Sequence, residues 1–169
     1  MNKSLFSLTY FIVFMLSGCG HNVSVLPQVT TNYNTNIVNI KANFIGNKKY
    51  FPDIFDETRN SQLTASLEYD IIYDNDNLKY DKFNLFNPLV LVGFKLGEDS
   101  IAVTASLTIS SNLKNINRTY HSECFATTTR NLFNNGGTTE IRNLCLNSIK
   151  NNFNAQIISD IQKGELNVF

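Results

Sequence analysis

The first candidates for chemistry are a histidine and a cysteine three residues apart, His121 and Cys124, with Glu123 between them. A cysteine becomes a nucleophile when a neighbouring base takes its proton, so such a pair could serve a hydrolase. The surrounding sequence predicts a β-strand, in which residues an odd number of positions apart point to opposite faces. The spacing therefore gives no local cysteine–histidine pair.

Metal ligands are also sparse in this chain. It contains only two histidines, His21 and His121, and lacks the C-x-x-C and H-x-x-x-H spacings that are typical of zinc sites. The acidic string at 74–77 hints at a calcium loop, but Lys79 and Leu85 stand where an EF-hand requires glycine and glutamate. We expect a solvated turn there and no metal or other cofactor.

Carboxylates are the remaining catalytic possibility, because paired carboxylates can act as acid and base. Asp53, Asp56 and Glu57 lie close together within a long connection over residues 46–61. Acidic residues in loops are usually solvated surface groups. We therefore expect no catalytic residues and no enzymatic activity, and keep a hydrolase with an unrecognised active site as the alternative.

The N-terminus has the pattern of a targeting segment. Lys3 precedes an apolar stretch from Leu5 to Leu16, which is shorter than the roughly 20 residues that a membrane-spanning helix needs. The sequence Leu16-Ser17-Gly18-Cys19 resembles a bacterial lipobox, the cleavage and lipidation motif of bacterial lipoproteins. The alternative is an ordinary signal peptide that happens to end in a cysteine.

The lipoprotein resemblance implies that residues 1–18 are a signal peptide and that Cys19 becomes the first mature residue. Cys19 would carry a thioether-linked diacylglycerol and an amide-linked acyl chain such as palmitate, enough for stable anchoring in a bilayer. Gly20 follows, where an Asp commonly retains lipoproteins of Gram-negative bacteria at the inner membrane. For such a host, the resemblance implies the outer membrane, facing the periplasm.

Lipidation of Cys19 would leave Cys124 and Cys145 as the remaining cysteines. In the oxidising periplasm, two cysteines have one possible intramolecular pairing. We therefore expect a Cys124–Cys145 disulfide, which would contribute roughly 3 kcal/mol in the loop-entropy description.

After the expected signal peptide, the chain divides into an N-terminal linker and a folded domain. Residues 19–35 contain Pro27 and show no sustained periodicity, so we expect a lipidated N-terminus and a flexible tether. Alternation of apolar and polar residues, or a continuous apolar run, predicts five strands, with antiparallel pairing of the last three. They are placed at about 36–45, 62–73, 89–96, 100–110 and 116–126.

A long helix is predicted after the glycine pair Gly136-Gly137. From Ile141 to Ile161 an apolar residue recurs every four positions, and Lys163-Gly164 provides a typical end. The sequence therefore predicts one α+β domain over residues 36–169. It would be a five-stranded, mostly antiparallel sheet with one long C-terminal helix packed on it.

Composition restricts the possible partners. The chain has 14 Lys+Arg and 14 Asp+Glu, so it offers no basic field for nucleic acid. Its 25 Asn indicate a neutral, hydrogen-bonding surface. We expect a membrane-anchored envelope protein that acts as a binding, assembly or transport-auxiliary subunit and contacts an envelope protein; an envelope hydrolase is the alternative. The partner could dock on a sheet edge or on the aromatic segments 50–52 and 83–86.

Overall fold

The structure is a computed structural model that describes residues 21–29, 39–74, 88–92, 96–132 and 136–167. The expected signal peptide at 1–18, Cys19 and the aromatic segment 83–86 lie outside these residues. None of the helices in the described ranges is both long and apolar enough to cross a membrane.

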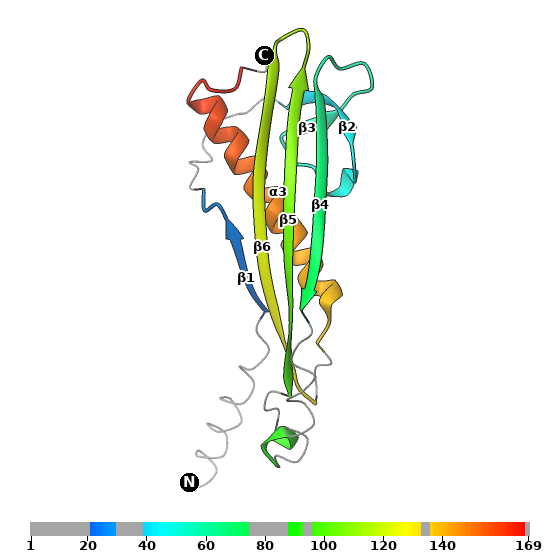
Figure 1. Cartoon of the computed structure of the whole chain (residues 1–169), viewed down its shortest axis with the longest axis vertical. Coiled ribbons are helices and arrows are strands. Elements are labelled where there is room, and N and C mark those ends of the chain that lie inside the picture. Colours follow the sequence, from blue (N-terminus) through cyan, green and yellow to red (C-terminus); the bar gives the residue numbers. More distant parts are fainter. Residues whose placement is uncertain (1–20, 30–38, 75–87, 93–95, 133–135, 168–169) are drawn as a thin grey trace, which may run out of the picture.

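A six-stranded mixed sheet forms the larger layer of the fold, in the order β1-β6-β5-β4-β2-β3 (Figure 1). β1, β6, β5 and β4 pair antiparallel, whereas β2 is parallel to both β4 and β3. The bounds are β1 His21–Leu26, β2 Ile40–Ile45, β3 Phe55–Glu57, β4 Thr64–Asp74, β5 Gly97–Ser111 and β6 Ile116–Arg130. The expected α+β class is confirmed, with one strand more than predicted.

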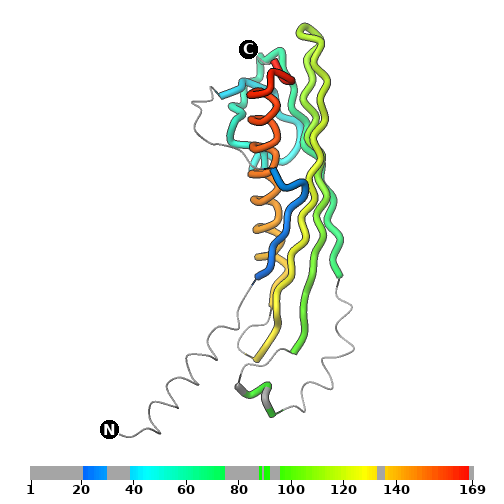
Figure 2. Tube along the Cα trace, turned by 90° about the vertical axis from the view of Figure 1, so that its left-hand side faces the viewer, coloured from blue at the N-terminus to red at the C-terminus, as the bar shows by residue number. Residues whose placement is uncertain are grey.

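The second layer is a single helix, α3, from Thr138 to Gln162. It crosses one side of the sheet diagonally, so that the two layers are seen edge-on in Figure 2. The predicted stripe faces the sheet: Ile141, Ile149, Phe153 and Ile157 are all at most 2% exposed. The helix ends where Gly164 adopts a φ of +73°, as the Lys163-Gly164 signal predicted.

A disulfide links the two layers. Cys124, in the middle of β6, is bonded to Cys145, two turns into α3, and their Cα atoms lie 5.5 Å apart. Both residues are completely buried on the helix-facing side of the sheet. The bond therefore holds the N-terminal half of α3 against β6.

The expectation of a flexible tether at 19–35 is wrong for part of its length. His21–Leu26 forms β1, which pairs with β6 from Glu123 to Thr128. Beyond the strand, the side-chain amide of Asn152 donates a 2.6 Å hydrogen bond to the carbonyl of Pro27. Only Val23 and Val25 show the alternation of a strand, and this pattern is too short to be recognised without its neighbour.

The prediction of a strand at 89–96 is also wrong. Pro88–Val92 forms a short 3-10 helix, η2, with Val90 buried and Leu91 71% exposed, and residues 93–95 lie outside the described part. A short continuous apolar run does not distinguish a buried strand from a helical segment. The central position belongs to β5, which begins at Gly97 and lies between β4 and β6.

The long connection at 46–61 has structure of its own. It contains a 3-10 helix, η1, at Lys48–Tyr50, and β3. Tyr50 and Phe51 are 7% and 3% exposed, and the Phe51 ring stacks on Phe44 with centroids 4.1 Å apart. The aromatic segment 50–52 is therefore core, and the expectation that it offers a docking site is wrong.

Candidate binding face

One side of the sheet carries no covering element among the described residues. In Figure 2, α3 lies along the other side of the sheet. We call the uncovered side the open face; it consists of the side chains of β4, β5 and β6 that alternate with the buried, helix-facing ones. Because side chains alternate along a strand, the helix-facing residues of β5 are buried while those between them are wholly or partly accessible. The sequence therefore places a core on one side and an accessible polar surface on the other.

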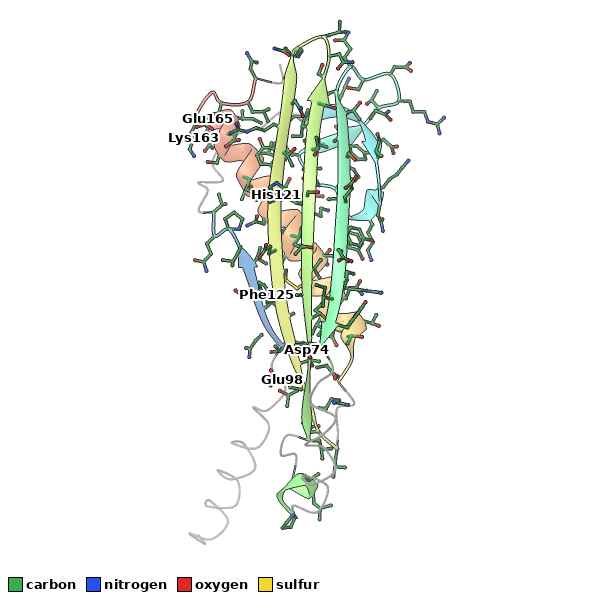
Figure 3. All side chains as sticks on the ribbon, viewed as in Figure 1. Asp74, Glu98, His121, Phe125, Lys163 and Glu165 are labelled. Carbon is green, nitrogen blue, oxygen red and sulfur yellow. A yellow bond between two sulfur atoms is a disulfide. The ribbon has the colours of Figure 1, made fainter. Side chains whose placement is uncertain are left out.

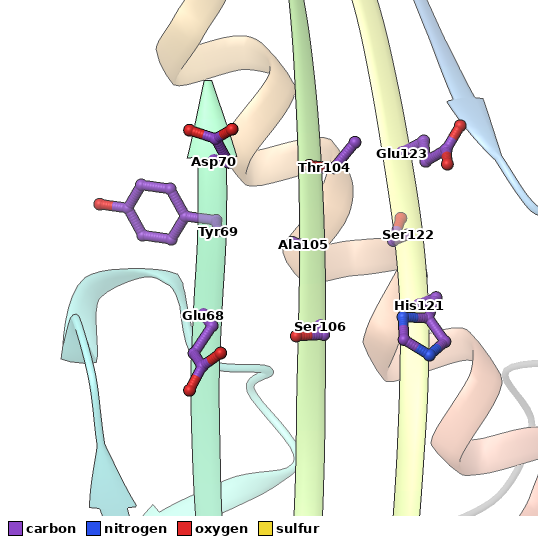
Figure 4. A pocket seen from close by; sticks show the side chains of 9 residues that line it. All are labelled: Glu68, Tyr69, Asp70, Thr104, Ala105, Ser106, His121, Ser122 and Glu123. Carbon is purple, nitrogen blue, oxygen red and sulfur yellow. The ribbon is translucent and has the colours of Figure 1, made fainter. Parts of the chain in front are cut away.

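A shallow hollow of about 460 Å³ lies at the centre of the open face (Figure 4). The strand register places its side chains in two rows, each crossing β4, β5 and β6. One row is Glu68, Ser106 and His121, and the other is Asp70, Thr104 and Glu123. The hollow is thus lined by three carboxylates, one imidazole and hydroxyl groups.

The charged groups of the hollow are hydrated, and those on β4 and β6 are set well apart. Neighbouring strands lie about 4.8 Å apart, so residues on β4 and β6 in the same row are separated by roughly 10 Å. Glu68, Asp70, His121 and Glu123 are all exposed to solvent. Such separated, hydrated groups can each accept or donate hydrogen bonds to a partner.

An apolar row lies next to the hollow. Ile72, Ala102 and Phe125 are opposite one another across β4, β5 and β6. Ile72 is 60% exposed and Phe125 is 47% exposed, and Phe125 is visible at mid-height in Figure 3. Large apolar side chains beside hydrogen-bonding groups are the composition expected of a protein-binding surface.

The open face is electrostatically one-sided. Its positions on β4, β5 and β6 carry five carboxylates and no Lys or Arg over the described length of these strands. The carboxylates are Glu68, Asp70, Asp74, Glu98 and Glu123. Since the whole chain has equal numbers of acidic and basic residues, this face is negative because the basic residues lie elsewhere.

The carboxylates that sequence reasoning had grouped do not act together. Asp53 forms an ion pair with Lys150 at 2.5 Å, and Glu57 forms one with Lys48 at 2.5 Å. Asp56 accepts a hydrogen bond from a different side chain. The loop therefore holds separate surface contacts and no carboxylate pair.

His121 and Cys124 lie on opposite sides of β6, as their odd spacing predicted. His121 lines the hollow on the open face, whereas Cys124 is buried beneath α3 in the disulfide. Within the residues that the structure describes, no group of three or more His, Cys, Asp or Glu side chains could hold a metal ion.

A second polar cluster joins the C-terminal end of α3 to β6. Arg118 is 3.1 Å from Asp160 and 3.0 Å from Glu165, and the Tyr120 hydroxyl donates to Asp160 at 3.0 Å. Burial, followed by the Asp160 hydrogen bond, raises the pKa of Tyr120 above its usual range. The Asp160 hydrogen bond likewise raises the pKa of Arg118. These ion pairs and the hydrogen bond therefore connect the C-terminal end of α3 to β6.

The open-face residues were not recognised as a site from sequence. The alternation of β4 already assigned Glu68 and Asp70 to the polar side of a strand, but their neighbours in space come from strands up to 55 residues later. The sequence signal that could have identified the face is the polar side of three successive antiparallel strands. Using this signal requires the correct register between the strands.

Comparisons of the chain with known proteins found no match: no protein-family model matches it, and neither does a curated protein or a solved structure.

Proposed function

We propose that the chain is a lipid-anchored protein of the bacterial cell envelope that binds a partner through the open face and has no enzymatic activity. The anchor is Cys19 of the lipobox-like sequence, and the expected location is the outer membrane, facing the periplasm. The partner is a protein of the envelope, for which this chain serves as a binding, assembly or transport-auxiliary subunit.

The observation that carries the binding role is the uncovered sheet face. It combines exposed apolar side chains, Ile72 and Phe125, with a hollow lined by carboxylates and hydroxyls. Surface groups of this kind contribute affinity when a partner excludes water from the apolar part and meets the polar part with hydrogen bonds. On the opposite side of the sheet, α3 packs over β5 and β6.

The position of β1 fits anchoring close to the bilayer. β1 begins at His21, so a lipid on Cys19 would be separated from the folded sheet by Gly20 alone. Two residues of extended chain span roughly 7 Å. The proposal therefore keeps the body beside the membrane, where it would meet other envelope proteins.

Site-specific photocrosslinking in intact cells tests the binding role. A photoreactive residue at Thr104, in the hollow, should give a discrete adduct, whereas the same residue at Asn151, exposed on α3, should not. Adducts from Asn151 alone, or equally from both positions, would contradict the assignment of the face.

Mass spectrometry of the membrane fraction tests the anchor. The N-terminal peptide should begin at Cys19 and carry the acyl chains, and Cys19→Ala should leave the protein without them. A soluble, unmodified chain that begins elsewhere would refute the proposed lipid anchor and membrane location.

A further inference from the structure

β4 lies between β5 and β2 in the sheet, but only a short part of β4 is paired on the β2 side. β4 pairs with β5 along its whole length, but on its other side β2 covers only Thr64, Ala65 and Ser66. Over residues 70–73, no described strand pairs with this side of β4. At Tyr69, residues 47–50 already lie against the strand, because Tyr50 packs on the Tyr69 ring and Asn47 donates to its hydroxyl. An unpaired strand edge is a template for a further strand.

The hydrogen bonds of β4 show which backbone groups face this edge. The carbonyl of Asp74 accepts from the Ser100 hydroxyl on β5, so its backbone points inward. The N–H of Ile71 instead donates to the Asp70 side chain at 2.9 Å. Because the direction alternates along an antiparallel strand, the backbones of Tyr69, Ile71 and Tyr73 face outward.

The two sides of this edge differ in chemistry. Tyr69 and Tyr73, on the helix side, are 37% and 45% exposed. Glu68, Asp70 and Asp74 alternate with them on the open face. A strand added here would therefore place one set of its side chains beside aromatic groups and the other set beside carboxylates.

We propose that this edge receives a β-strand of a partner protein in which Lys or Arg alternates with apolar residues. The apolar residues would lie beside Ile71 and Tyr73, and the basic ones beside Glu68 and Asp70. Asp70 now blocks the Ile71 N–H, as charged side chains commonly protect free edges. A basic side chain attracts the Asp70 carboxylate away and leaves the N–H for the incoming strand.

A second copy of the chain fits the edge poorly. If two β4 strands paired antiparallel about Ile71, Glu68 of each copy would lie opposite Asp74 of the other. Like charges directly across a strand pair destabilise it. Charge complementarity therefore selects a basic partner strand over self-association.

This inference rests on the proposed binding role, whose partner class it specifies. It is tested on the full chain as cells produce it, purified in a nonionic detergent, with short synthetic peptides as probes. One labelled peptide alternates Lys with Val and Phe, and a second replaces every Lys with Glu. Fluorescence anisotropy measures both affinities at low and at high salt.

We expect the Lys peptide to bind at least tenfold more tightly than the Glu peptide at low salt, and less tightly as salt is added. Asp70→Lys should weaken its binding at least fivefold. The matched control, Asp56→Lys, makes the same change of charge at an exposed position on β3 and should alter binding less than twofold.

The edge itself is tested with Ile71→Pro, which removes an outward N–H and leaves the inward bonds to β5 in place. It should abolish binding of the Lys peptide while circular dichroism stays unchanged. Should this variant not fold, a photoreactive phenylalanine in the peptide locates the site on the unmodified chain. Adducts within residues 67–74 support the proposal.

Three results would overturn the proposal: equal affinity for both peptides, adducts confined to other strands or to α3, or a β4-mediated dimer of the chain itself. The peptide assay does not involve the lipid or the cellular partner. Its failure would remove the edge proposal, whereas a failed crosslink at Thr104 or an unmodified Cys19 would remove the proposed function.

Discussion

Loss of the Cys124–Cys145 disulfide should lower stability by an amount that follows from its place in the chain. The bond closes a loop with a sequence separation of 21. For a loop of this length, the entropy that the crosslink removes from the unfolded chain corresponds to about 3 kcal/mol at 25 °C. For a domain of about 150 residues, this loss lowers the melting temperature by roughly 6–12 °C.

The assay compares oxidised protein with protein that was unfolded, reduced and refolded in reductant, using circular dichroism during heating. Unfolding is necessary because Cys124 and Cys145 are both 0% exposed, so a reductant cannot reach the bond in the folded state. The Cys124→Ala/Cys145→Ala variant is the control, since its melting temperature should not respond to reductant. Equal melting temperatures of the oxidised and reduced wild-type protein would refute the reasoning, as would two reactive thiols in the oxidised protein after unfolding.

Four further substitutions examine the core, two glycines with positive φ and an ionisable group. Phe153→Ala should cost about 3–5 kcal/mol in chemical denaturation, because the ring is 0% exposed; a cost below 1 kcal/mol would contradict its core position. Gly46→Ala should cost about 1–3 kcal/mol, because φ is +119° and the new Cβ would collide with the Leu67 carbonyl oxygen. Gly164→Ala, with φ +73° and open space, should cost only about 1 kcal/mol, and the reverse order would be inconsistent with these geometries. The raised pKa of Tyr120 means that the unfolded chain releases the phenol proton first, so stability should fall as pH rises above about 10. Tyr120→Phe should make this fall less steep, and an unchanged slope would show that another group causes it.

The parts of the fold that could be predicted are those with a long local pattern. α3 repeats its apolar stripe from Ile141 to Ile161, and β4 alternates over 11 residues, so neither depends on a neighbour for recognition. The β5–β6 connection at 112–115 also lies between the strands predicted at 100–110 and 116–126. In such segments the periodicity alone identifies the element and its buried side.

The missed elements are those whose partners decide their structure. β1 and β3 have six and three residues, and each is a strand only because a neighbour supplies its hydrogen bonds. Residues 88–92 are apolar throughout, and an apolar run fits a strand or a helical turn equally well. The register across β4, β5 and β6, which creates the open face, is likewise not encoded in any one segment.

The correction at β1 changes what the proposed anchor would do. A tether of about 15 residues would let the body move tens of ångströms from the bilayer, and the open face could then meet partners throughout that space. β1 instead begins two residues after Cys19, and its pairing of His21 with Thr128 is five residues along β6 from Glu123 in the hollow. At about 3.3 Å per residue, the hollow lies roughly 15–20 Å along the strand from the first residue of the sheet. A lipid on Cys19 would therefore confine the hollow and the adjacent β4 edge to a zone near the membrane surface. A partner that supplies a basic strand must present it in that zone, which favours a protein that is itself held at the same bilayer.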